Sequence, residues 1–386
     1  MKNLYIDPDI TKASTISSEF YTSTEWFEIT KEKIFSKTWQ FCISTEELTT
    51  NRQLIPFTLL PGYLEEPLLF AKDELGTIRC LSNVCTHRGK ILIEEPCVAH
   101  KIKCSYHGRR FNFCGELLHM PEFELTKDFP SNNDNLSQIS TGILEPFLFA
   151  SLSPVVPFHE VFAEIKERLF WLPMEKMRLD KEKCKDYVVK SHWALYCENY
   201  LEALHIPFVH PSLRKVIDCN TYTTELFRYC NLQLALASPD EVSFDLPKGA
   251  QDYGKQVAAY YFWIFPNTML NFYPWGCSVN VVKPLSPELT QVSFLSFVLD
   301  ESKFGKGAGG ALDQVEQEDE RVVESVQRGI KSRYYDIGRF SQQKNRALII
   351  FKDYFVSFLM IEIRSVTCSD LERKIFLIND LDQLSN

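Results

Sequence analysis

The chain has no run of basic residues and no apolar segment of the kind that begins a secreted protein. Its 42 Lys and Arg stand against 51 Asp and Glu, for a net charge of -9. Without a basic cluster, a chain is poorly suited to nucleic acid or to an anionic membrane surface. The N-terminus turns acidic at Asp7 and Asp9 instead of continuing into an apolar stretch. We therefore expect a cytoplasmic protein that acts on a small molecule or on a protein partner.

An unbroken membrane-spanning stretch is also missing. Residues 256–282 contain no charged residue, but Pro266, Pro274 and Gly276 interrupt them. A membrane helix needs about 20 consecutive apolar residues. The Tyr, Phe, Trp and Val content and the turn signal at Pro266 predict a pair of buried strands instead.

The twelve cysteines lack the regular spacing of a disulfide framework, which indicates a reducing compartment. Only two of them have the spacing of metal ligands. Cys85 precedes His87 by two residues, and Cys104 precedes His107 by three. A zinc site with two Cys and two His usually groups like ligands together, whereas a Rieske [2Fe-2S] cluster takes two thiolates on one iron and two imidazoles on the other. The mixed order predicts a Rieske cluster, with structural zinc as the alternative.

The neighbouring residues indicate which Rieske subclass to expect. Lys90 and Tyr106 stand where Rieske proteins of respiratory and photosynthetic complexes carry two further cysteines joined by a disulfide. The chain therefore resembles the oxygenase or ferredoxin type. Gly89 and Gly108 would let the backbone approach the sulfides, and the Tyr106 hydroxyl could donate to a sulfur atom or could simply pack.

A second metal site is indicated further along the chain. Glu198, Glu202 and His205 are spaced to share one helix face, and Pro207 is expected to break that helix just before His210. Two imidazoles and one carboxylate form the facial triad that leaves positions open on Fe(II). The missing carboxylate could be Glu202 or a more distant acid.

Periodicity points to Asp319 as that acid. A helix is predicted at about 312–330, and position 319 falls on its apolar stripe. Burying a carboxylate is costly unless it is paired or binds a metal, so Asp319 is either a metal ligand or a buried salt-bridge partner. The stripe consists of Leu312, Val315, Val322, Val326 and Ile330, and the acids expected to face solvent are Glu316, Glu318, Glu320 and Glu324.

From about residue 20 to about residue 345 the chain resembles the Rieske non-haem iron oxygenases, in particular the large (alpha) subunits of the aromatic-ring-hydroxylating and choline-monooxygenase-like groups. The motifs are C-T-H-R-G, C-S-Y-H-G-R-R-F, E-N-Y-L-E-x-x-H-x-x-x-x-H and E-D-E-R-V-V-E-S-V-Q-R-G. The resemblance implies that the [2Fe-2S] cluster is held by Cys85, His87, Cys104 and His107. It likewise implies that a mononuclear Fe(II) is held by His205, His210 and Asp319, with Glu202 and Asn199 as catalytic residues.

The resemblance also implies an α+β fold, in which a small antiparallel Rieske domain is followed by a larger domain whose curved antiparallel sheet and helices enclose the iron. The expected divisions are an N-terminal segment (1–38) packing on the catalytic domain, the Rieske domain (39–155) and the catalytic domain (156–386). Two features depart from the family pattern. Arg109 stands where many members have Trp, and the segment 348–386 does not match.

Family members form trimers in which the cluster of one subunit passes electrons to the mononuclear iron of the next. By this resemblance, Glu202 links His107 of one subunit to His205 of its neighbour, and a separate reductase or ferredoxin supplies electrons from NAD(P)H. Many ring dioxygenases have Asp at the position of Glu202, so the Glu favours enzymes that oxidise quaternary ammonium compounds.

We expect hydroxylation of a small organic substrate with O2, or N-demethylation when an N-methyl carbon is attacked. The alternatives are an aromatic-ring dioxygenase, a Rieske electron carrier without enzymatic activity, and a binding protein whose fold is stabilised by structural zinc. A carrier would not need the second metal site, and a zinc protein would be colourless. Rings that could face a cation or a flat aromatic substrate are Tyr260, Phe262, Trp263, Phe272, Tyr273 and Trp275.

Overall fold

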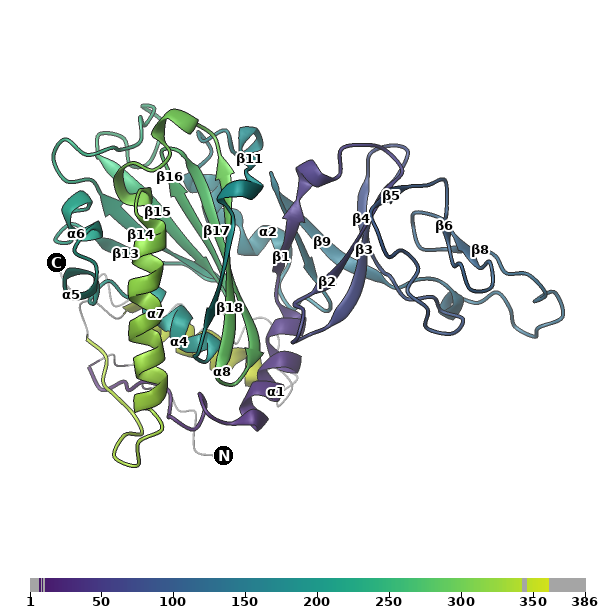
Figure 1. The fold of residues 1–386 in the computed structure, drawn as a ribbon, viewed down its shortest axis with the longest axis horizontal. Coiled ribbons are helices and arrows are strands. Elements are labelled where there is room, and N and C mark those ends of the chain that lie inside the picture. The colour runs from purple at the N-terminus through teal and green to yellow at the C-terminus, as the bar shows by residue number, and fades with distance from the viewer. Residues whose placement is uncertain (1–6, 8, 10, 342–345, 361–386) are drawn as a thin grey trace. The chain divides into compact units, whose positions relative to one another are not determined.

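The computed structural model describes residues 7, 9, 11–341 and 346–360, which form two compact units (Figure 1). The smaller unit is Ser36–Val156, and the larger unit combines the described parts of Met1–Phe35 and Pro157–Asn386. Both units are built on antiparallel sheets, and the helices belong mainly to the larger unit. The predicted α+β class with an antiparallel Rieske domain and a larger catalytic domain is confirmed.

The smaller unit contains a seven-stranded sheet in the order β1-β10-β9-β4-β3-β2-β5 and a three-stranded sheet in the order β6-β7-β8. The central strands bury apolar side chains, as in Leu68–Ala71 of β3, and this burial supports the sheet. The strands are β1 (Gln40–Ser44), β2 (Gln53–Leu59), β3 (Glu66–Lys72), β4 (Ile78–Ser82), β5 (Cys97–Val98), β6 (Ile102–Lys103), β7 (Arg110–Phe111), β8 (Leu117–His119), β9 (Gln138–Leu144) and β10 (Phe147–Ser151).

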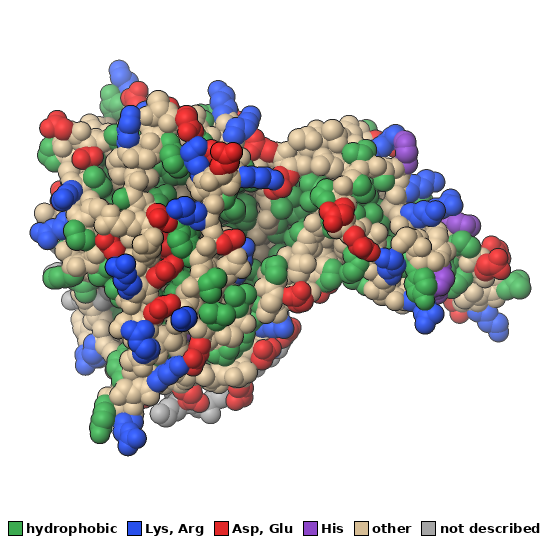
Figure 2. Space-filling model, in the orientation of Figure 1, with side chains coloured by type: hydrophobic (Ala, Val, Ile, Leu, Met, Phe, Trp, Pro, Cys, Tyr) green, Lys and Arg blue, Asp and Glu red, His purple; other side chains and the backbone are tan. Residues whose placement is uncertain are grey.

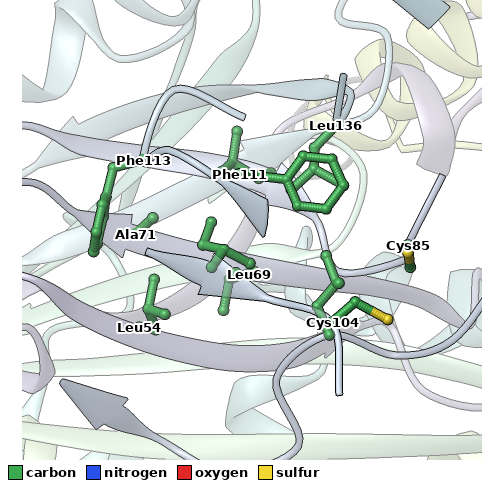
Figure 3. Packing of buried hydrophobic residues seen from close by; sticks show 11 residues of the cluster. Leu54, Leu69, Ala71, Cys85, Cys104, Phe111, Phe113 and Leu136 are labelled. Atoms are coloured by element: carbon green, nitrogen blue, oxygen red, sulfur yellow. The ribbon is translucent and has the colours of Figure 1, made fainter. Parts of the chain in front are cut away.

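One apolar cluster of this unit includes Cys85 and Cys104 together with side chains such as Leu69 and Phe111. Figure 3 shows both cysteines at the same end of the cluster. Packing of these strands therefore places the two cysteine loops on a common apolar base.

The larger unit contains an eight-stranded sheet in the order β11-β18-β17-β16-β15-β14-β13, with β12 pairing to β18 beside β11. The uncharged stretch forms three consecutive strands, β15 to β17, instead of the predicted pair, because a second turn at Pro274 separates β16 from β17. The strands are β11 (Arg178–Leu179), β12 (Lys185–Val189), β13 (Thr223–Leu226), β14 (Cys230–Leu236), β15 (Val257–Ile264), β16 (Thr268–Tyr273), β17 (Gly276–Ser286) and β18 (Leu289–Val298).

Two helices of the larger unit matter for the site. Helix α4 packs against α7 and β17, and α7 lies across the sheet (Figure 1). Among the described helices, none is both long enough and apolar enough to cross a membrane. The helices are α1 (Thr24–Lys33), α2 (Phe158–Val161), α3 (Ala163–Arg168), α4 (Trp193–Tyr200), α5 (Ile206–Val209), α6 (Leu213–Val216), α7 (Leu312–Gly329) and α8 (Arg346–Met360).

Single 3-10 turns connect many of these elements. They are η1 (Phe35–Lys37), η2 (Thr45–Glu47), η3 (Asn132–Asp134), η4 (Met174–Lys176), η5 (Lys181–Lys183), η6 (Glu301–Lys303) and η7 (Gly307–Gly309). Figure 2 shows acidic and basic side chains interspersed on the visible face of the larger unit.

The prediction that one helix carries Glu198, Glu202 and His205 on a shared face and breaks at Pro207 is wrong. Helix α4 ends at Tyr200, and Pro207 lies in the first turn of the short helix α5 instead of breaking a longer one. A proline is tolerated there because the first amide groups of a helix have no partner within it. The segment 348–386, for which no structure was predicted, begins within α8, and its residues 361–386 lie outside the described part of the chain.

Candidate metal centres and substrate cavity

The two cysteine loops of the smaller unit have the same backbone hydrogen bonds. In the first loop the Gly89 amide donates to the Cys85 carbonyl at 2.9 Å, and the Cys85 amide donates to the Lys90 carbonyl at 2.8 Å. The second loop repeats both bonds with Gly108, Cys104 and Arg109, at 3.1 and 2.8 Å. Gly89 and Gly108 both have positive φ, 70° and 78°, which side chains rarely allow. The loops are therefore structurally equivalent, as a cluster shared between them requires.

The predicted cluster ligands lie together. Cys85 and Cys104 are buried, and burial raises the pKa of the Cys85 thiol, which also interacts with Cys104. The rings of His87 and His107 lie 4.8 Å apart, and burial lowers the pKa of His87 with the help of the His107 charge. His107 Nδ1 is buried without a hydrogen-bond partner among the described atoms. Two adjacent thiols, two adjacent imidazoles and an unpaired ring nitrogen fit a [2Fe-2S] cluster.

Arg109 is 1 % exposed and donates to Asp134 at 2.6 Å. Its guanidinium also lies 5.5 Å from the centre of the Phe129 ring. A buried arginine is stable only when its charge is paired, so Asp134 explains how Arg109 replaces the tryptophan of many family members. Tyr106, by contrast, is largely exposed, and its ring lies 3.7 Å from that of His107.

The larger unit brings His205, His210 and Asp319 together. One potential ligand atom from each lies within 4.8 Å of the others. Asp319 Oδ1 is 3.0 Å from His210 Nε2 and 3.5 Å from His205 Nε2. His205 precedes α5, His210 follows it, and Asp319 comes from α7. Two imidazoles and one carboxylate facing a common point fit a mononuclear iron site.

The outer nitrogens of both imidazoles are held by carboxylates. His205 Nδ1 lies 2.6 Å from Glu202, and His210 Nδ1 lies 2.8 Å from Glu318. Asn199, at the end of α4, donates to Asp319 Oδ1 at 2.6 Å. Such partners fix ring orientation and tautomer, leaving each Nε2 free to bind a metal.

The buried face of α7 is shifted by about one residue from the face that the sequence predicted. Its fully buried positions are Glu316, Val323 and Gln327, whereas Val326 is 41 % exposed. Glu316 and Glu318 therefore do not belong to a solvated face, since Glu316 is buried and Glu318 pairs with His210. The prediction failed because the inward line of this helix consists mainly of polar side chains, which an apolar stripe cannot reveal.

Negative charge accumulates around the two imidazoles. Burial disfavours the charged form of His210, but its bonds to Asp319 and Glu318 outweigh that effect and raise its pKa. Burial raises the pKa of Glu316 to about 8, and the Asp319 charge adds to the shift. In this environment a bound divalent cation would offset the excess of carboxylates.

A cavity of about 100 Å³ lies beside this triad. Of the six rings predicted to face substrate, only Tyr273 lines it. The other five are buried without lining the cavity, and Trp275 stacks on Tyr273 from behind it at 5.4 Å between ring centres. Tyrosines at positions not predicted take their place. The aromatic residues of the wall are Tyr196, Tyr200, Tyr222, Tyr261, Tyr273 and Phe294, and its amides are Asn199, Gln233, Asn271 and Asn280.

Two family models match the chain in its two units. Residues 38–130 match the Rieske [2Fe-2S] domain, and residues 174–359 match the catalytic domain of the ring hydroxylating alpha subunit. The second match reaches the end of α8, further than the resemblance seen in the sequence. The two matched domains define the class as Rieske oxygenase.

Curated relatives and solved structures agree with this class. The chain is 28 % identical to the chloroplastic choline monooxygenase of Arabidopsis thaliana (87 % of this chain, 81 % of the relative) and 26 % identical to the carnitine monooxygenase oxygenase subunit of Escherichia coli strain K12 (84 % and 86 %). A quaternary ammonium Rieske monooxygenase in complex with L-carnitine has the same fold, with a TM-score of 0.71 at 23 % identity over 91 % of this chain and 97 % of that one. Naphthalene 1,2-dioxygenase from Rhodococcus sp. gives a TM-score of 0.68 at 16 % identity over 90 % and 95 %.

This chain belongs to the Rieske non-haem iron oxygenases. It is an oxidoreductase with a Rieske [2Fe-2S] cluster and a mononuclear iron, and it receives electrons from a separate reductase. Sequence reasoning missed Glu318, Glu316 and most of the cavity tyrosines. Glu318 directly precedes Asp319, and nothing about this position in the sequence indicated that its side chain would pair with His210.

Proposed function

We propose that this enzyme hydroxylates a methyl or methylene carbon of a quaternary ammonium compound, with release of an aldehyde when an N-methyl carbon is attacked. The observation that carries the proposal is the tyrosine-rich cavity beside the triad of His205, His210 and Asp319. Aromatic faces attract alkylammonium groups at about 0.5–2 kcal/mol per contact. The choline and carnitine monooxygenases among its relatives support the same substrate class.

We assign the cluster to Cys85, His87, Cys104 and His107, and the mononuclear iron to the triad. When bound, these centres would store an electron and activate dioxygen. Glu202 and Glu318 hold the outer nitrogens of the two triad imidazoles, so that each ring keeps its Nε2 toward the metal. Asn199 orients Asp319 by donating to its carboxylate.

The wall of the cavity would position the substrate. Tyr200 donates to Asn271 at 2.7 Å, and Tyr222 and Tyr261 stack with ring centres 6.4 Å apart. These contacts hold the rings in place before substrate arrives, which lowers the entropic cost of binding. The apolar side chains of the lining, among them Ile206 and Leu312, would limit the water that reaches the reacting carbon.

The assembly we propose is a homotrimer in which Glu202 also reaches His107 of the neighbouring subunit. One oxygen of Glu202 pairs with His205 and the other accepts from the Leu204 amide, and the side chain retains 16 % exposure through which a neighbouring subunit could reach it. The twelve cysteines lack the spacing of a disulfide framework, which favours action in a reducing compartment, and we take this to be the cytoplasm.

The test is oxygen uptake by the holoenzyme with a reductase and NAD(P)H. Choline, betaine and carnitine should stimulate uptake more than benzoate or naphthalene, and formaldehyde or another aldehyde should appear in proportion to the oxygen consumed. If only aromatic compounds couple uptake to hydroxylation, the enzyme is a ring dioxygenase.

A further inference from the structure

The three-stranded sheet of the smaller unit carries basic side chains on one of its faces. Lys103 of β6 stands directly opposite Arg110 of β7, and Arg110 stands opposite His119 of β8. Residues directly opposite each other on antiparallel strands lie on the same side of a sheet. All three are exposed, as is Lys101, two residues before Lys103. We call the row of Lys103, Arg110 and His119 the basic face.

The other face of this sheet is buried. Ile102 and Phe111 stand opposite each other, are fully buried and belong to the apolar cluster that includes Cys104. Side chains alternate along a strand, so the neighbouring residues Lys103 and Arg110 are directed to solvent. Figure 2 shows basic and histidine side chains at the end of the smaller unit where Figure 1 labels β6 and β8.

No acidic side chain offsets the positive charge of the basic face. The sequence has no Asp or Glu from Pro96 to Gly115, and no acid in the described part of the chain pairs with Lys103 or Arg110. Like charges directly opposite each other destabilise a sheet. Other basic side chains of this unit are paired with acids, namely Arg52, Arg79, Lys90 and Arg109. The basic face is therefore suited to negative charge from another molecule.

The basic face lies beside one of the cluster ligands assigned above. Lys103 directly precedes Cys104, and the Cys104 amide donates at 2.8 Å to the carbonyl of Arg109, the residue before Arg110. A protein bound to this face would lie next to the strand that enters the cluster loop. The exit of electrons proposed above passes through His107, so entry and exit would use different contacts.

We propose that the basic face is the docking surface for the electron donor of this enzyme, and that this donor is an acidic protein of the [2Fe-2S] ferredoxin type. The chain has a net charge of -9, so an acidic donor is repelled by most of the molecule and attracted here, which steers it to the cluster. One electron passes from the reduced ferredoxin to the oxidised Rieske cluster, and no bond forms or breaks. The inference requires a separate electron donor and does not depend on the substrate class.

The test measures the rate of cluster reduction in the oxidised holoenzyme, by anaerobic stopped-flow mixing followed at the cluster absorbance. The protein donor is a reduced plant-type [2Fe-2S] ferredoxin, which is acidic and has a lower reduction potential than a Rieske cluster. The comparison donor is reduced methyl viologen, a small cation. Reduction of the wild type by ferredoxin should slow about tenfold or more between low salt and about 0.5 M salt, because salt screens the attraction.

The double variant Lys103→Glu with Arg110→Glu should slow reduction by ferredoxin about tenfold or more, and reduction by methyl viologen should be no slower than in the wild type. The double variant Lys103→Gln with Arg110→Gln removes the charges without reversing them and should give a smaller loss with ferredoxin only. Lys176→Glu, at an exposed lysine of the larger unit, is the matched control and should stay within about twofold of the wild type. Complete reduction by dithionite verifies an intact cluster in each variant.

Equal ferredoxin rates in the wild type and both double variants would overturn the proposal, and so would a wild-type rate that does not respond to salt. A wild type that ferredoxin does not reduce at all refutes the acidic donor. A loss of equal size with both donors would assign the effect to the cluster itself. A changed oligomeric size of the double variants in size-exclusion chromatography would assign the basic face to another copy of this chain. Either of these last two results also overturns the proposal.

Discussion

His210 Nδ1 and Glu318 Oε2 lie 2.8 Å apart, while Nε2 of the same ring faces Asp319 at 3.0 Å. The imidazole is thereby held from both sides, with one nitrogen directed at the metal position. We therefore propose different tasks for the two adjacent acids on α7: Asp319 binds the metal, and Glu318 orients the imidazole of His210.

Glu318→Ala should lower the affinity for the mononuclear iron by about 10- to 100-fold, because the ring of His210 loses the partner that fixes its tautomer. Iron remaining after dialysis against a graded chelator measures the effect, and the cluster absorbance serves as an internal reference. Glu320→Ala on the same helix should retain iron as the wild type does. Equal iron retention in both variants would remove Glu318 from the site.

Asp319→Ala should lose the mononuclear iron and keep the cluster, since two imidazoles alone hold Fe(II) poorly. Glu202→Gln should keep both metals and lose turnover, because the amide can still bond His205 but cannot hold the same proton or charge. Metal analysis and single-turnover assays separate the two variants. The assignment of the triad fails if Glu202→Gln empties the iron site and Asp319→Ala does not.

Cys85→Ser and Cys104→Ser should each abolish the visible spectrum, because a hydroxyl does not replace a thiolate on ferric iron. The two loops have matching hydrogen bonds, so we expect losses of similar size. Cys97→Ser, at an exposed cysteine of the same unit, is the control. A full spectrum in either ligand variant contradicts the cluster assignment.

Arg168 holds Asp252 through two hydrogen bonds, at 2.7 and 3.0 Å, inside the larger unit. Burial alone would raise the pKa of Asp252, but Lys255 and Arg168 outweigh it and the net shift is downward. A depressed folded-state pKa contributes stability above the unfolded value, near about pH 4, and this contribution is lost as the pH falls through the folded-state pKa.

Asp252→Asn should therefore lower the free energy of unfolding by about 2 kcal/mol at pH 7, because Arg168 keeps only Glu225 as a charged partner. The difference between wild type and variant should shrink as the pH falls below about 4. Urea denaturation of the holoenzyme over this pH range provides the measurement. A difference that stays constant with pH would show that the charge of Asp252 does not contribute.

The sequence by itself determined what depends on short spacing. The order of Cys85, His87, Cys104 and His107 specified a mixed ligand set, because chemistry and distance along the chain suffice to recognise two loops with one thiolate and one imidazole each. His205 and His210 were proposed as ligands in the same way. Asp319 was proposed from an apolar stripe whose phase the structure shifts by about one residue, so its place beside the two imidazoles was decided by the tertiary structure.

The tertiary structure alone decided which other groups surround the metal and the substrate. Glu316 and Glu318 were assigned to solvent because carboxylates normally are, yet packing of α7 against α4 buries the first and pairs the second. The rings of the cavity were misassigned for a related reason. In the stretch that contains Tyr261 and Tyr273 both faces of the sheet are buried, so hydrophobicity does not distinguish the side chains that face the cavity from those that face the core.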